Sequence, residues 1–249
     1  MIMKKLLSLL IATTMVMVVG TPVQAKSSSR FMLTHFTLKG SEDEHDMRFS
    51  YNKQGLVTKI VDHEVVKIGD VTKSTNTYRY TYKKNQLVKR VDQIGSSTTT
   101  TTFTYQGKKI IASKPGYTQT LTMKNHKVIK AVSSDLNRTY SYNKKGQLIK
   151  ATANGKAYKN GYKYDKKGYA TAFNWDEGQV LGHFTHKITY KNNLPSVVKQ
   201  KLNGTQLVMR LYYKKMRVSS SAVKSQQYSF LHMDDPAALY LYNFAWYEL

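Results

Sequence analysis

Aromatic and apolar residues alternate with polar ones in short runs along most of this 249-residue chain. The clearest run is residues 139–150, in which Tyr140 and Tyr142 alternate with polar residues before the turn signal Asn-Lys-Lys-Gly at 143–146. Period-two alternation places both tyrosines on one face of a strand. A turn ending in glycine accommodates a left-handed residue at little cost. The run therefore predicts a β-hairpin.

The same unit recurs about every 23 residues, and such a fixed period is typical of repeat architectures. The residue just before each turn, here termed the anchor, is Tyr51, Tyr82, Tyr105, Met123, Tyr142, Tyr164, Tyr190 and Tyr213. Another aromatic or apolar residue precedes each anchor by two positions: Phe49, Tyr80, Phe103, Leu121, Tyr140, Tyr162, Ile188 and Leu211. A second kind of turn separates consecutive units, as at Ala153-Asn-Gly155.

Eight units of this kind predict about sixteen strands, with a first strand at residues 31–38 and room for one more at either end. Short strands joined by tight turns pair with their neighbours in sequence. Open sheets rarely exceed about ten strands without curling. We therefore predict an all-β fold in which an antiparallel meander of about eight hairpin repeats, at about 49–220, forms one strongly curved sheet: a half-barrel, barrel or spiral. Two separate domains are the alternative, although no proline- or glycine-rich linker divides the units.

The two ends of the chain depart from the repeat. Residues 1–25 have the basic start, apolar centre and small-residue cleavage site of a signal peptide, which leaves 26–249 as a single β-repeat domain without a stable membrane span. The aromatic segment at about 228–249 alternates in a way that favours a buried closing strand over a helix. With no cysteine, disulfides and thiolate metal sites are excluded, which favours a bacterial source. We expect a secreted, extracellular protein that charge could retain on the cell wall.

Two units, Tyr140-Ser-Tyr-Asn-Lys-Lys-Gly-Gln-Leu148 and Tyr162-Lys-Tyr-Asp-Lys-Lys-Gly168, resemble the tyrosine/aspartate (YD) repeat of Rhs-type bacterial proteins. The resemblance covers about residues 49–220. It implies a curled β-sheet built of hairpins, associated in that family with carbohydrate or surface binding or with enclosing a toxin. The chain departs from the family pattern because the signature aspartate stands only at Asp165 and no toxin domain follows the repeats.

Lysines gather in the first-kind turns of a chain whose formal net charge is +24. Because these turns lie at one end of a meander, we predict a polyanion-binding ridge that includes Lys83, Lys84, Lys108, Lys109, Lys144, Lys145, Lys166, Lys167, Lys214 and Lys215. Lysine suits a flexible polyanion because it acts as a point charge and needs no fixed bidentate geometry. The alternative is that exposed lysines only keep a β-protein soluble and discourage edge association.

Other constellations carry weaker signals. The acidic run at 42–46 lacks the glycine and the ligand spacing of a calcium loop, so we expect a solvated acidic loop. Neither a metal site nor a cofactor is predicted. No catalytic motif is present, and the carboxylate pairs Asp62 with Glu64 and Asp176 with Glu177 are the candidates for glycoside hydrolysis.

These observations favour a non-enzymatic binding or adhesion protein that engages anionic polymers, namely wall teichoic acid, glycan, extracellular DNA or a lipid surface. Sequence-specific nucleic-acid binding is not expected. A carrier-like β-barrel that encloses an apolar ligand is the first alternative. A glycan-processing enzyme is the second.

Overall fold

The computed structural model describes residues 13–14, 27–40, 43–67, 69–125, 127–134, 137–145, 147–154, 156–157, 161–166, 170–176, 183–192, 194–202, 205–219 and 231–232. Every helix or strand assigned in those residues is a β-strand, which confirms the all-β class. The described part of the chain contains no helix that is long and apolar enough to cross a membrane. The signal peptide and the aromatic tail fall almost wholly outside the described residues, so both stay predictions.

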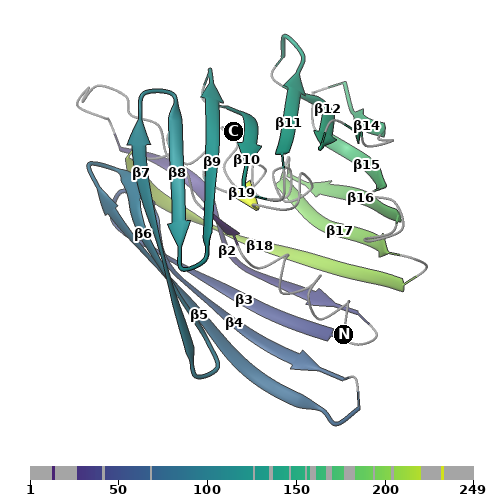
Figure 1. The fold of residues 1–249 in the computed structure, drawn as a ribbon. Coiled ribbons are helices and arrows are strands. Elements are labelled where there is room, and N and C mark those ends of the chain that lie inside the picture. Colours follow the sequence, from purple (N-terminus) through teal and green to yellow (C-terminus); the bar gives the residue numbers. More distant parts are fainter. Residues whose placement is uncertain are drawn as a thin grey trace.

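The strands of the main sheet follow one another closely along the chain (Figure 1). They are β2 (Ser27–Lys39), β3 (Asp43–Tyr51), β4 (Val57–Val66), β5 (Thr72–Lys83), β6 (Gln86–Ile94), β7 (Ser97–Gln106), β8 (Lys109–Lys114), β9 (Tyr117–Lys124), β10 (Lys127–Val132), β11 (Asn137–Tyr142), β12 (Leu148–Ala153), β13 (Lys156–Ala157), β14 (Gly161–Tyr164), β15 (Ala170–Asp176), β16 (His183–Lys191), β17 (Leu194–Leu202) and β18 (Thr205–Ser219). Two short strands, β1 (Thr13–Thr14) and β19 (Leu231–His232), pair separately with each other.

The main sheet is an antiparallel meander in circular order, since β18 pairs with β2 along most of both strands. Antiparallel ladders run from β14 through β18 and β2 to β13, and no ladder joins β13 to β14 in the described residues. Alternation over this series makes β13 and β14 run in the same direction, and the sheet is not closed between them in the described residues. The predicted meander of hairpins in one strongly curved sheet is confirmed.

The last predicted unit differs from the other seven because its anchor is not followed by a turn. β18 continues through Tyr213 to Ser219, and its Lys214 and Lys215 pair with Met32 and Phe31 of β2. Residues 214–219 (Lys-Lys-Met-Arg-Val-Ser) contain no glycine, asparagine, aspartate or proline that would favour a turn, and β2 offers an edge to pair with. The placement of Lys214 and Lys215 in a turn was therefore wrong.

A β-bulge recurs at the anchors. At seven of the eight anchors the register shifts, and the partner strand carries one extra residue. These extra residues are Thr34, Thr58, Val88, Ile129, Ile149, Thr171 and Ser196. Where the extra residue is threonine or serine, its hydroxyl donates to the carbonyl of the residue before the anchor, at 3.1–3.4 Å. Because bulges increase local strand bending and twist, their recurrence explains why the sheet curls.

The anchor tyrosines fasten each unit to the preceding one. The hydroxyl of Tyr82 donates to the Val57 carbonyl at 2.8 Å, and that of Tyr105 donates to the Leu87 carbonyl at 2.9 Å. In each case the acceptor lies directly opposite the preceding anchor. Tyr142 and Tyr164 repeat the pattern with Val128 and Leu148.

This series of hydrogen bonds also joins the two ends of the meander. Tyr51, the first anchor, donates to the Leu33 carbonyl, and Leu33 lies opposite Tyr213, the last anchor. Burial raises the pKa of Tyr51 and Tyr82, so their hydroxyls keep the proton that they donate. The contact between units thus relies on tyrosine hydroxyls as well as on backbone ladders.

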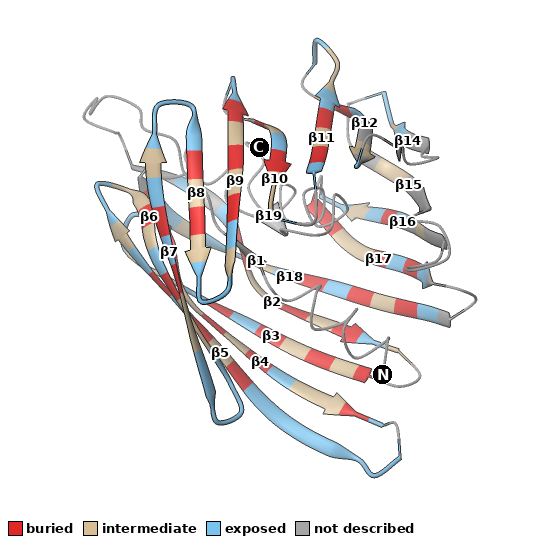
Figure 2. Cartoon of the chain, in the orientation of Figure 1, coloured by how far each residue is buried: buried red, intermediate tan, exposed pale blue. Residues whose placement is uncertain are grey.

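The core consists of the inward-facing residues near the anchors, which alternate with exposed residues along the strands (Figure 2). The residues two positions before the anchors are buried wherever their side chains are described: Phe49, Tyr80, Phe103, Leu121, Tyr140, Ile188 and Leu211. The residues opposite the anchors complete this core with Leu33, Val57, Leu87, Ile110, Val128 and Leu148. The residues that the sequence pattern predicts to face inward are therefore the residues that form the core.

Candidate functional site: a lysine rim

The first-kind turns lie at one end of the meander. They follow β3, β5, β7, β9, β11, β14 and β16, and strands that alternate in direction bring such turns to the same end. Figure 1 shows the turns that join β7 to β8 and β11 to β12 at the top of the view, on either side of β9 and β10. Each unit advances by two strands, about 10 Å. Because β18 pairs with β2, these turns follow the end of one curved sheet.

We define the lysine rim as the exposed lysines of these turns: Lys53, Lys83, Lys84, Lys108, Lys109, Lys124, Lys144, Lys145, Lys166 and Lys191. Of the lysines predicted from the sequence, seven belong to the rim, whereas Lys167 lies outside the described residues. Lys214 and Lys215 are also exposed, but they lie on β18. Those seven are exposed in the turns at one end of the sheet, and their role in binding a polyanion stays a prediction.

Asparagines hold the rim turns in shape. The Asn52 carboxamide oxygen accepts from the backbone N–H groups of Gln54 and Leu56 at 3.0 and 2.9 Å. Asn143 repeats this arrangement with Lys145 and Gln147, both at 3.0 Å. Side-chain bonds of this kind stabilise tight turns, so the lysines extend from fixed backbone.

Other rim turns use residues with positive φ. Lys84 and Asn85 have φ values of 50° and 61°, and both central positions of a type I′ hairpin turn require such values. Asn125 and Asn192 also have positive φ, at 48° and 53°. Asparagine adopts this region more readily than most residues, which explains why it recurs in turns that carry lysine.

The rim lysines have no carboxylate partner among the described ion pairs. Those pairs are His35–Asp46, His45–Asp62, Arg48–Asp46, Lys67–Glu44 and Arg90–Asp92. Asp165 is the one acidic residue of the described rim turns, and the other described acids lie on strands or in turns at the opposite end. The rim therefore presents cations that no described ion pair neutralises.

Lys127 differs from the rim lysines because it is half-buried. Its ammonium lies over the Tyr142 ring, 5.1 Å from the centroid. Burial lowers the pKa of Lys127. A cation over an aromatic face is attracted to the ring, so Lys127 packs against the anchor rather than facing solvent.

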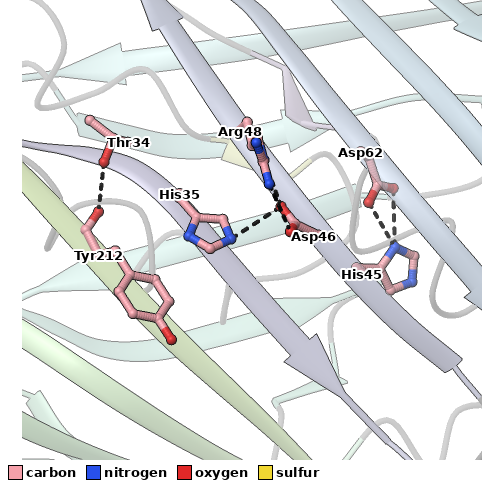
Figure 3. Close-up of polar contacts among 7 residues, drawn as sticks. All are labelled: Thr34, His35, His45, Asp46, Arg48, Asp62 and Tyr212. Carbon is pink, nitrogen blue, oxygen red and sulfur yellow. Dashed lines mark hydrogen bonds and ion pairs between the residues drawn. The ribbon is translucent and has the colours of Figure 1, made fainter.

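A buried polar cluster occupies the inner face of β3–β6, away from the rim. The His45 Nδ1 atom lies 3.0 and 3.1 Å from the two carboxylate oxygens of Asp62, and both side chains are buried (Figure 3). Glu64 accepts from Ser74 and Asn76 at 3.1 Å each. The expectation of a solvated acidic loop was therefore wrong for residues 43–46, because they belong to β3 and alternation turns Asp43 and His45 inward.

Opposing effects set the protonation of His45. Burial alone would lower its pKa, but the hydrogen bond that His45 donates to Asp62 and the charges of Asp62, Glu64 and Asp43 outweigh that effect and raise it. The adjacent Tyr78 has a raised pKa because of burial and the nearby Asp62 charge. Arg90 stacks over the Tyr78 ring at 5.2 Å and donates to Asp92. The cluster thus pairs its buried charges with one another.

The outer face of β18, β2 and β3 carries a second polar group (Figure 3). His35 stacks on Tyr212 with ring centroids 4.8 Å apart, and its Nε2 atom lies 3.1 Å from Asp46. Arg48 donates to the same carboxylate through Nε at 3.2 Å. Burial would raise the pKa of Asp46, but Arg48, His35 and His63 outweigh this and hold it below its ordinary value.

The candidate catalytic carboxylates have structural partners. Asp62 is fully buried and bound to His45, and Glu64 is bound to Ser74 and Asn76. No nucleophile is hydrogen-bonded to the His45 imidazole in the described part of the chain. Within the same residues, no group of three or more histidine, cysteine, aspartate or glutamate side chains is placed to hold a metal ion. The pair Asp176 and Glu177 lies outside the described side chains.

Sequence reasoning missed the pairing of His45 with Asp62 and the hydrogen bonds of the anchor tyrosines. A signal for the first was present, because Asp43, His45, Met47, Phe49 and Tyr51 occupy every second position and end on an anchor. The second depends on a contact across units, which follows from register and not from any single unit.

No family model and no curated protein matches the chain. Among solved structures, it is similar to a porin-like protein from Bacteroides uniformis (13% identity, TM-score 0.47, covering 74% of this chain and 98% of that one). It is also similar to a porin-like protein from Bacteroides vulgatus (12% identity, TM-score 0.40, covering 74% and 99%). A third similarity is to the Photorhabdus luminescens Tc holotoxin pore (18% identity, TM-score 0.29, covering 68% and 11%). With TM-scores below 0.5, these similarities establish neither a shared fold nor a shared function, and the resemblance to YD repeats stays a prediction.

Proposed function

We propose that the protein is a non-enzymatic binding protein that engages anionic envelope or host polymers and surfaces through the lysine rim. The observation that carries the proposal is the row of turns at one end of the curved sheet, each with at least one exposed lysine outside every described ion pair. Secretion, retention on the cell wall and the absence of catalysis are parts of the same proposal.

Electrostatics supports an anionic partner. Successive rim turns, about 10 Å apart, lie near one Debye length from one another at physiological salt, so each turn acts as a nearly separate contact for a phosphate, sulfate or carboxylate. A polyanion that engages several of them releases counterions, which makes binding strongly salt-dependent. Because Asn52 and Asn143 fix two of the rim turns, those turns lose little backbone freedom on binding.

Retention of the mature protein on immobilised heparin over a salt gradient tests the proposal. We expect wild-type protein to bind at low salt and to elute late, whereas the charge-reversal variant Lys108→Glu/Lys144→Glu/Lys145→Glu elutes much earlier. The matched control is Lys187→Glu/Lys199→Glu/Lys201→Glu, which makes the same charge change at exposed strand positions of β16 and β17. Flow-through of wild-type protein at low salt, or equal losses in both variants, would contradict the proposal.

A further inference from the structure

Exposed apolar side chains accompany the lysine rim. Ile149 is 52% exposed and follows Leu148, which lies opposite the anchor Tyr142. Tyr212 is 45% exposed and precedes the anchor Tyr213. Phe31 is 40% exposed and pairs with Lys215. All three lie within two residues of an anchor or of the residue opposite it, so large apolar groups and cations outside the described ion pairs share one end of the sheet.

From this combination we propose that the lysine rim docks end-on onto an anionic lipid surface, with lysines at the headgroup phosphates and Phe31, Ile149 and Tyr212 in the interfacial layer. This inference rests on the proposed function and names its partner. Lys214 and Lys215 contribute to the same surface, since they are exposed on β18 beside Tyr212 and opposite Phe31 and Met32.

The curvature of the sheet favours a surface over a linear polymer. Because the sheet is strongly curved and β18 pairs with β2, the turns of the rim follow a curved line. A single polymer chain reaches neighbouring turns but must bend sharply to reach all of them. A lipid surface presents phosphates in two dimensions and can meet many turns at once.

The apolar residues discriminate further between these partners. A soluble polyanion offers no apolar phase, so exposed isoleucine and phenylalanine contribute little to binding it. At a bilayer, tyrosine and other amphipathic or apolar groups partition into the interfacial region. Each lysine close to an anionic surface strengthens binding by about fivefold. The two kinds of residue therefore act together only on a lipid surface.

Sedimentation with vesicles tests the inference. The probes are vesicles of phosphatidylcholine alone and vesicles with one third phosphatidylglycerol, and the protein is the full mature chain. We expect binding to the anionic vesicles only, weakened by salt. Lys108→Gln/Lys144→Gln/Lys145→Gln should lower the affinity by roughly two orders of magnitude, whereas Lys187→Gln/Lys199→Gln/Lys201→Gln should change it much less.

A matched pair of apolar substitutions separates lipid from polymer. Ile149→Thr removes an apolar group at the rim, and Ile94→Thr removes one that is 50% exposed at the opposite end. We expect Ile149→Thr to reduce vesicle binding several-fold and to leave heparin elution unchanged, while Ile94→Thr changes neither. Circular dichroism spectra and urea midpoints establish that all variants fold.

The outcomes separate the inference from the function on which it rests. Retention on heparin without binding to anionic vesicles overturns the proposal that the rim docks on a lipid surface, and it leaves the proposal of polyanion binding intact. Equal effects of Ile149→Thr and Ile94→Thr on vesicle binding also overturn the proposal that the rim docks on a lipid surface. Failure to bind either heparin or anionic vesicles overturns both proposals.

Discussion

The charged residues of the lysine rim and those of the buried cluster of β3–β6 differ in how their charges are balanced. At the rim, successive lysine-bearing turns lie about 10 Å apart in solvent, where screening weakens the repulsion between them. On the inner face, Asp62 and His45 are almost fully buried and form a close pair. An uncompensated charge would be costly in that position. Surface cations can therefore stay available for a partner, whereas buried charges must satisfy one another.

Substitution of Asp62 should have the largest effect on folding. Asp62→Asn removes the counter-charge of a buried imidazolium, so we expect a loss of about 3 kcal/mol in the free energy of unfolding at pH 5. Urea denaturation measures the loss. The matched control is Asp70→Asn, in an exposed turn, which should change stability by less than about 0.5 kcal/mol. A loss in Asp62→Asn as small as that in Asp70→Asn would show that the buried ion pair stabilises the protein no more than a surface charge does.

The pH dependence of stability follows from the raised pKa of His45. Because the folded-state pKa exceeds the unfolded one of about 6.5, the contribution of His45 is fully present below that pH. It is lost as the pH rises through the folded-state pKa. We expect the stability difference between wild-type protein and His45→Gln to shrink from pH 5 to pH 9. Urea midpoints across that range measure it, and a difference that grows with pH would contradict the assignment.

The anchor hydroxyls should contribute less than the buried pair. Tyr105→Phe removes the bond to the Leu87 carbonyl and keeps the ring, so we expect a loss of about 1 kcal/mol. Tyr212→Phe is the control, because this ring is exposed and stacks on His35. Its hydroxyl should matter by less than about 0.5 kcal/mol. Indistinguishable losses would mean that the series of tyrosine bonds does not stabilise the contact between units.

Neutralising the rim should affect stability least. Lys144→Gln/Lys145→Gln removes exposed charges that no described ion pair uses, so we expect a change within about 0.5 kcal/mol. A loss above 1 kcal/mol in urea denaturation would show that these lysines support the fold. The rim lysines would then stabilise the fold, and binding could not be changed at the rim without changing stability.

Much of the fold could be predicted from the sequence because the information is local and repeated. Alternation fixed the inward positions, and Asn-x-x-Gly signals marked turns such as that after Tyr142. The eighth unit was mispredicted because spacing alone placed a turn after Tyr213, although the next six residues favour a strand. The pairing of β18 with β2 joins residues that lie far apart in sequence, and no local pattern reveals it.

The candidate site, like the fold, could be predicted from the sequence only in part. Lysines in turns could be located from the sequence, because turn chemistry is local. The acidic run at 42–46 was assigned to a loop because its composition outweighed its alternation. Its inward positions become informative only when β4 supplies Asp62 as the partner of His45. Charge pairing across strands needs the register, which the sequence does not state.

The most direct test of the account is the salt dependence of binding to a linear polyphosphate of defined length. We compare wild-type protein with a rim variant, Lys108→Gln/Lys109→Gln/Lys144→Gln/Lys145→Gln, and a control variant, Lys73→Gln/Lys187→Gln/Lys199→Gln/Lys201→Gln. The two variants have the same net charge. If rim lysines contact the phosphates, the slope of log K against log salt should fall by roughly 3 in the rim variant. The control should keep the wild-type slope. Equal slopes in the two variants would show that net charge, and not the rim, governs binding.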